Sequence, residues 1–168
     1  MATKSQEKKY QIDSFEFIQN LIRQKNLKKI REVTSVHYYG KKDGNDVEKI
    51  VVYPDRVEVH VWKNIDGNFV SVEDFKVDSE QKGLKWLKSR GFKEANIINM
   101  DYTEYGYEDG TIGLYTIDDF HKSAILNFPP NKHQDVEKVF GLQSSEVITV
   151  PYNKLMEKMG KLRTLDLL

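Results

Sequence analysis

The sequence predicts an α+β protein in which eight antiparallel strands close into a tunnel-like β-barrel or form one strongly curved sheet. The first observation is residues 55–78, DRVEVHVWKNIDGNFVSVEDFKVD, which read as two strands joined by a turn at residues 64–68. An Asp-Gly pair between β-rich runs is a strong hairpin signal. The second observation is that two groups of β-rich segments flank one helical segment, and the third is helical spacing near the C-terminus. We expect a single domain over residues 1–168, with a crossover helix and C-terminal helices.

The central hairpin has two different faces in its first arm. Side chains alternate along a strand, so Val57, Val59 and Val61 point to one side. The other side carries polar and aromatic residues, namely Arg56, Glu58, His60 and Trp62. This polar face either lies in water with cross-strand ion pairs or lines a cavity. If it lines a cavity, Arg56, Glu58 and His60 are candidate ligand contacts.

The segments before the hairpin predict a strand, a helix and two further strands. Residues 4–12 alternate polar with β-forming side chains, which predicts a first strand of polar character. Asp13 and Ser14 can cap a helix in which Phe15, Ile18 and Leu21 recur at helical spacing. Residues 31–39 and 47–53 are β-branched and aromatic, and the turn residues 40–46 separate them. These strands are expected to be antiparallel neighbours.

The segments after the hairpin predict the crossover helix, three strands and two C-terminal helices. Ser79 and Glu80 begin the crossover helix, and Gly91 ends it. Residues 95–107, 111–117 and 123–128 are β-rich and are separated by turn residues. Residues 135–140 and 152–162 carry apolar side chains at helical spacing. The prediction is seven or eight strands and four helices.

Composition narrows the class of partner. The chain has 26 basic and 26 acidic residues, so no overall field favours nucleic acid or an anionic membrane. It contains no cysteine, which excludes disulfides and a thiolate nucleophile. The first ten residues lack the apolar core of a signal peptide, and no apolar run reaches the roughly 20 residues that span a bilayer. We expect a cytoplasmic protein whose partner is a small-molecule ligand, with no membrane partner, while the sequence leaves the oligomeric state open.

Three stretches of the chain resemble the CYTH, or triphosphate tunnel, family. QEKKYQI at residues 6–12 is similar to the family's opening ExExK strand. LKWLKSRGF at residues 84–92 is similar to its mid-chain helix, and FGLQSSEVITVPYNKLM at residues 140–156 is similar to its closing segment. Together these stretches and their spacing cover nearly the whole chain. The resemblance implies an eight-stranded tunnel in which Lys and Arg hold a triphosphate and Glu holds Mg²⁺ or Mn²⁺.

The family's site residues carry over to a few positions. Glu7 matches the second Glu of ExExK and becomes the candidate metal ligand, and Lys9 matches its Lys. Lys63 is similar to the Lys that ends an inner strand, unless the register turns it outward. The resemblance therefore implies that Lys9 and Lys63 are the catalytic candidates, and that Glu7, Lys9 and Lys63 bind the ligand.

The departures from the family pattern concern charge. Ser5 stands where the first Glu belongs, and residues 123–130, SAILNFPP, lack the late Glu-x-Glu pair. The third strand, VEKIVVYPD, lacks an Arg-x-Arg. Residues 96–103, NIINMDYT, replace a basic strand and offer Asp101 as a candidate ligand contact. Alternatively, Asp101 faces solvent while Ile98, Met100 and Tyr102 fill a closed core.

These departures weigh against strong catalysis. We expect a divergent domain that binds a small phosphorylated or polar ligand, with weak or no triphosphate hydrolase activity. One alternative is an active triphosphatase or adenylyl cyclase that depends on Mg²⁺ or Mn²⁺. The other alternative is a non-catalytic interaction module.

Overall fold

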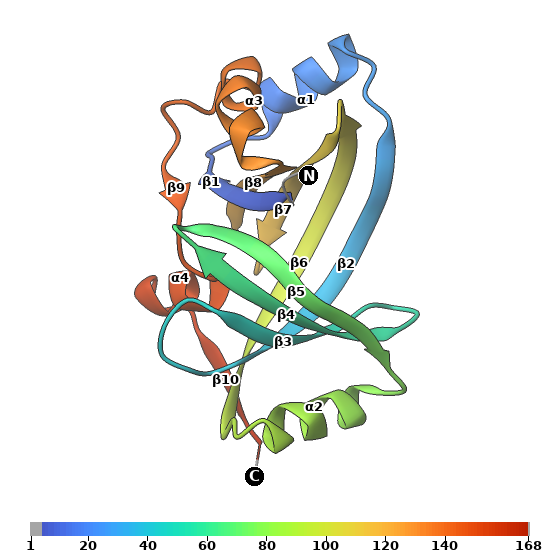
Figure 1. Ribbon diagram of the computed structural model, residues 1–168, viewed down its shortest axis with the longest axis vertical. Helices are drawn as coiled ribbons and strands as arrows, with labels where there is room; N and C mark the ends of the chain where they lie inside the picture. Colours follow the sequence, from blue (N-terminus) through green and yellow to red (C-terminus); the bar gives the residue numbers. More distant parts are fainter. Residues whose placement is uncertain (1–4, 168) are drawn as a thin grey trace.

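The protein is a closed antiparallel barrel in a computed structural model that describes residues 5–167 (Figure 1). Eight strands form the ring in the order β6-β2-β3-β4-β5-β1-β8-β7, and pairing of β7 with β6 closes it. Lys4, at the start of the expected first strand, lies outside the described residues. The α+β barrel expected from the sequence is confirmed.

The strands of the ring are β1 (Gln6–Gln11), β2 (Lys29–Gly40), β3 (Val47–Val52), β4 (Val57–Ile65), β5 (Asn68–Val77), β6 (Glu94–Tyr107), β7 (Gly110–Ile117) and β8 (His121–Phe128). Two short strands extend the sheet outside the ring. β9 (Val147–Ile148) pairs with β1, and β10 (Arg163–Asp166) pairs with the start of β6. Neither β9 nor β10 is predicted by the sequence, since each strand has too few residues to show an alternating pattern.

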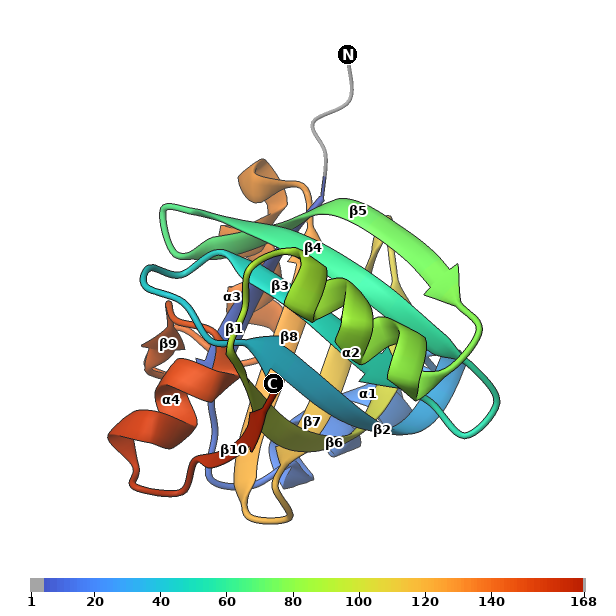
Figure 2. The ribbon, with the colours of Figure 1, turned by 90° about the horizontal axis from the view of Figure 1, so that it is seen from below.

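Three helices cover the outside of the barrel. α1 (Glu16–Gln24) and α3 (His133–Val139) lie at one end of the molecule, and α2 (Glu80–Ser89) lies at the opposite end (Figure 1). Seen along the other axis, α2 lies across β3 and β4 (Figure 2). Leu87 of α2 packs on Ile50 of β3 in a separate apolar cluster. None of the helices in residues 5–167 is long and apolar enough to cross a membrane.

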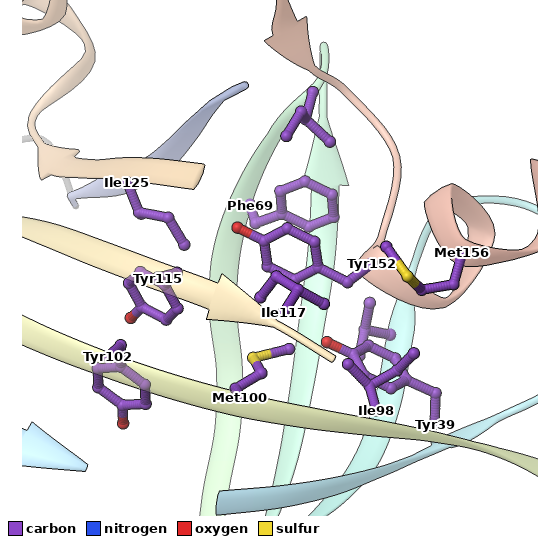
Figure 3. Close-up of a cluster of buried hydrophobic side chains, with 12 residues drawn as sticks. Tyr39, Phe69, Ile98, Met100, Tyr102, Tyr115, Ile117, Ile125, Tyr152 and Met156 are labelled. Carbon is purple, nitrogen blue, oxygen red and sulfur yellow. The ribbon is translucent and has the colours of Figure 1, made fainter. Parts of the chain in front are cut away.

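The fourth helix, α4 (Tyr152–Lys158), contributes to the inside of the barrel. A single-turn 3₁₀ helix, η1 (Pro130–Lys132), leads into α3, and the chain then runs through β9 to α4. Tyr152 and Met156 of α4 join the apolar cluster formed by inward side chains of the ring, including Ile98 and Ile117 (Figure 3). α4 is shorter than the helix expected over residues 152–162, because Gly160 ends it with a positive φ and β10 follows.

The register decides which side chains enter the barrel. Cross-strand partners point to the same face, and the pairs Lys9–Ile125, Lys49–His60 and Arg31–Glu104 all face inward. The polar face of the central hairpin is therefore its inner face, and the valines of β4 face outward. Val59 is fully buried on that outer face, where α2 covers the sheet.

Candidate functional site

A cavity of about 100 Å³ lies inside the barrel. Its lining combines charged groups with aromatic rings and comprises Glu7, Lys9, Arg31, His37, Tyr39, Val47, Lys49, Tyr53, His60, Trp62, Phe69, Met100, Tyr102, Glu104, Tyr115, Ile125, Pro151 and Tyr152. By this measure one water needs about 10–15 Å³, so the space suits a small ligand.

Lys9 enters the cavity from β1 and is only 4% exposed. Its ammonium donates a 2.7 Å hydrogen bond to the Val150 carbonyl and lies 4.1 Å from the ring centres of both Phe69 and Tyr152. Burial lowers the pKa of Lys9 to about 7, although Glu7 opposes this shift. Because an ammonium has three N–H donors, this group keeps donor capacity beyond the bond to Val150.

Lys49 enters the cavity from β3. Its ammonium donates a 3.3 Å hydrogen bond to the Tyr39 hydroxyl and lies 4.8 Å from the centre of that ring. Burial lowers the pKa of Lys49 to about 8, against the opposing charge of Glu7. Lys49 is therefore a second cation of the cavity, half-buried and with donor capacity left over.

Glu7 lies on β1, two residues before Lys9. Burial raises the pKa of Glu7 to about 7, while the charge of Lys49 acts in the opposite direction. Within residues 5–167, the Glu7 carboxylate accepts no hydrogen bond and lies within 4 Å of no cationic nitrogen. Glu7, Lys9 and Lys49 thus share one cavity without a direct ion pair.

Arg31 and Glu104 form a pair across β2 and β6. The guanidinium makes two hydrogen bonds to the carboxylate, at 2.9 and 3.2 Å, and lies over the Tyr102 ring. Tyr115 donates a third bond to Glu104, at 3.2 Å. The Tyr102 and Tyr115 rings stack at 4.4 Å (Figure 3). This arrangement leaves Glu104 fully engaged and Arg31 largely neutralised.

Two cavity side chains carry ring nitrogens that have no partner. Among the described residues, His37 Nδ1 and Trp62 Nε1 are buried from water and make no hydrogen bond. The other nitrogen of His37 lies 2.9 Å from the Ser35 hydroxyl. Burial lowers the pKa of His37 well below its ordinary value and also lowers that of His60. Both imidazoles are therefore neutral at pH 7.

The donor set does not make a protein-held site for Mg²⁺ or Mn²⁺. No group of three Asp, Glu, His or Cys residues in the described part of the chain could hold a metal ion. Glu104 is engaged by Arg31 and Tyr115, which leaves Glu7 as a single carboxylate. The inward positions of β8 are Ser123, Ile125 and Asn127, so the carboxylates missing from the sequence pattern are missing from the cavity as well. A metal bound through Glu7 stays a prediction.

The structure places some of the residues proposed from the sequence in the cavity and others outside it. Glu7, Lys9 and His60 line the cavity. Lys63 does not, because it shares the outward parity of Val59 and Val61 and is exposed, so the expected inward placement is wrong. Asp101 is also exposed on the outer face of β6, and the inward set is Ile98, Met100, Tyr102 and Glu104. Of the two alternatives left open for this strand, the structure shows the one with Asp101 facing solvent.

Arg56 and Glu58 lie beyond the cavity lining. Arg56 bonds to Glu58 at 2.7 Å and to Asp55 at 2.9 Å, and its guanidinium lies 3.9 Å from the centre of the Tyr53 ring. Glu58 also contacts His60 at 2.9 Å. These two residues therefore form an ion-paired cluster next to the cavity, and their role as ligand contacts stays a prediction.

Sequence reasoning missed three charged residues of the cavity, Arg31, Lys49 and Glu104. Ile50 is buried on the outer face of β3 under α2, and Val51 is buried on the same inner face as Lys49, so no polar–apolar alternation marks Lys49 as inward. For Arg31 and Glu104, the signal that could have found them is their direct pairing across β2 and β6. That pairing depends on a register which the sequence does not state.

Comparison with known proteins supports the fold. No model of a known protein family matches the chain, and no curated protein matches it. Solved structures do match, at low identity. PH1012 from Pyrococcus horikoshii OT3 has a TM-score of 0.77 at 16% identity, over 88% of this chain and 96% of that one.

Two further structures carry a functional description. A candidate adenylate cyclase from Bacillus halodurans matches with a TM-score of 0.62 at 14% identity, over 94% of this chain and 98% of that one. HpAC1 from Hippeastrum, a candidate adenylyl cyclase with a dominant triphosphatase activity, matches with a TM-score of 0.59 at 9% identity, over 95% and 97%. This chain shares the fold of these candidate cyclases, which are of the CYTH, or triphosphate tunnel, type. The resemblance stated from the sequence is thereby confirmed at the level of a divergent CYTH-type fold, and the site chemistry must be argued from the residues.

Proposed function

We propose that the barrel binds a small phosphorylated ligand in its cavity and has weak or no triphosphate hydrolase activity. The observation that carries this proposal is the pair of lysines that line the cavity, the buried Lys9 and the half-buried Lys49. Each ammonium has three N–H donors and a single hydrogen-bond acceptor among the described residues. Burying a cation without a counter-charge is costly, and an anion between these groups would offset that cost.

The weak-activity part of the proposal rests on the carboxylates. Phosphoryl transfer from a triphosphate needs several cations and metal ions around the developing charge. In this cavity one cation is paired with Glu104, and Glu7 is the single carboxylate left for a metal. The triphosphatase activity described for HpAC1 belongs to that protein, and the same activity here is the alternative that the experiment must test.

Thermal shifts test the binding half of the proposal. Orthophosphate, phosphomonoesters and polyphosphates should raise the midpoint of the wild-type protein. Lys49→Met should abolish this shift, while Lys63→Met, the same substitution at an exposed position on the neighbouring strand, should keep it. Equal shifts in wild type and Lys49→Met would overturn the cavity as the binding site.

Phosphate release tests the catalytic half. Nucleoside triphosphate and inorganic triphosphate are each assayed with Mg²⁺ and with Mn²⁺. We expect turnover that is barely above the protein-free rate. Robust turnover that is lost in Glu7→Ala would instead establish an active metal-dependent triphosphatase.

A further inference from the structure

The charges inside the cavity nearly cancel. Three cations, on β1, β2 and β3, face two carboxylates, on β1 and β6, which leaves a formal charge of +1 among the described lining residues. The two lining histidines add nothing at neutral pH, because burial lowers the pKa of both His37 and His60. A polyphosphate chain would therefore bring several uncompensated negative charges into a buried space.

The three cations also differ in how much of their positive charge is available to a ligand. Arg31 makes its two charge-assisted bonds to Glu104, and transferring that guanidinium to a ligand would leave Glu104 without its partner. Lys9 and Lys49 have no ion-pair partner within 4 Å in residues 5–167. The positive charge available to a ligand is therefore that of two lysines.

The size of the cavity gives an independent restriction. About 100 Å³ corresponds to roughly seven to ten water-sized groups. By this measure the space matches orthophosphate, which has fewer atoms than this, more closely than a triphosphate chain, which has more. The rings of Phe69 and Tyr152 also line the cavity, and each ring centre lies 4.1 Å from the Lys9 ammonium.

The cavity also contains two buried ring nitrogens that have no hydrogen-bond partner among the described residues. His37 is 5% exposed, and its Nδ1 has no partner in the described part of the chain. Trp62 Nε1, which is a donor only, is likewise unpartnered. Of the two, the Trp62 N–H is the group that can donate a hydrogen bond to an oxygen atom of a compact anion.

We infer that the cavity is built for a single phosphate dianion, either orthophosphate or a small phosphomonoester, rather than for a polyphosphate chain. This inference rests on the proposed function, because it names the class of phosphorylated ligand that the same site takes. Lys9 and Lys49 contact the phosphate oxygens, and the Glu7 carboxylate is the charge without an ion pair among the described lining residues that opposes an anion. The two positive charges of the lysines then match the two negative charges of one phosphate dianion.

Calorimetric titration tests the inference. The full chain is titrated with orthophosphate, glycerol phosphate, diphosphate and inorganic triphosphate, in EDTA at pH 7.5. We expect orthophosphate or glycerol phosphate to bind, and the tighter of the two identifies whether the ligand is free phosphate or an ester. Diphosphate and triphosphate should bind no more tightly. An affinity that grows about tenfold or more with each added phosphate would overturn the inference and leave the proposed function standing.

A variant that is expected to gain affinity is also tested, because a gain in binding cannot result from misfolding. Glu7→Gln removes the unpaired negative charge, so it should bind orthophosphate several-fold more tightly than wild type at pH 8. Weaker binding by a folded Glu7→Gln would contradict the role of Glu7. If none of the phosphates binds wild type or either variant, Glu7→Gln or Lys63→Met, the proposed function itself fails.

Discussion

The ammonium of Lys9 donates a 2.7 Å hydrogen bond to the carbonyl of Val150, 141 residues later in the chain. This bond ties the first strand of the barrel to the segment that leads into α4. It also places the lysine between two aromatic rings, where its charge is poorly solvated. The same side chain is therefore a structural link and the most deeply buried cation of the candidate site.

Stability should pass through a minimum near neutral pH. Glu7 titrates at about 7 in the folded barrel against an ordinary value of 4.5, so its contribution is fully present below pH 4.5 and is lost as pH rises to 7. Lys9 titrates at about 7 against 10.5, so its contribution is present above pH 10.5 and is lost as pH falls to 7. The free energy of unfolding, measured by urea denaturation from pH 4 to 10.5, should show this minimum.

The Glu7→Gln variant is the control for the acid limb. Since glutamine does not titrate, the decline between pH 4.5 and 7 should shrink while the rise above pH 7 persists. Identical profiles in wild type and Glu7→Gln would show that Glu7 is not the buried carboxyl responsible.

Gly113 should tolerate no side chain. A Cβ atom there would lie 2.4 Å from Cε1 of Tyr115, whose ring leans over the glycine and stacks on Tyr102. Gly113→Ala must displace this ring and loosen the bond from Tyr115 to Glu104, at a cost of about 1–3 kcal/mol of unfolding free energy. Gly106→Ala is the matched control, because its Cβ would meet Ile30 at an ordinary 3.4 Å. Equal losses in the two variants would refute the packing argument.

The ion-paired cluster beside the cavity should matter less than the cavity lysines. Arg56 already has Glu58, Asp55 and the Tyr53 ring as partners, so little of its charge is left for a ligand. We expect Arg56→Met to weaken phosphate binding by less than about threefold, against at least about tenfold for Lys49→Met. Calorimetry on both variants measures the difference, and a larger effect at Arg56 would move the site to this cluster.

The succession of the ring strands along the chain could be predicted because turn residues separate β-rich runs, whereas pairings such as β2 with β6 and β1 with β8 were not predicted. The hairpin of β4 and β5 follows from its turn residues. The start of α2 follows from the capping residue Ser79, whose hydroxyl accepts a hydrogen bond from the backbone N–H of Lys82. The short strands β9 and β10 carry no such signal. They form because the edges of β1 and β6 are available to pair with them.

The site was harder to predict because it depends on register. Alternation correctly grouped Glu58, His60 and Trp62 on one face of β4, and the same parity excludes Lys63, whereas Arg56 precedes the strand. On β6, a similar mixture of polar and apolar residues occupies both faces, so the outward Asp101 and the inward Glu104 look alike in sequence. The pairing of Arg31 with Glu104 distinguishes them, and it joins residues 73 positions apart.

The most direct test of the central claim uses the two tryptophans. Trp62 lines the cavity, whereas Trp86 lies on α2, packed edge-on against Phe75. In a Trp86→Phe protein, titration with orthophosphate should change the remaining Trp62 fluorescence in a saturable way, and Lys49→Met in the same background should abolish that change. A fluorescence change that is absent in Trp86→Phe but present in Trp62→Phe would contradict binding inside the barrel.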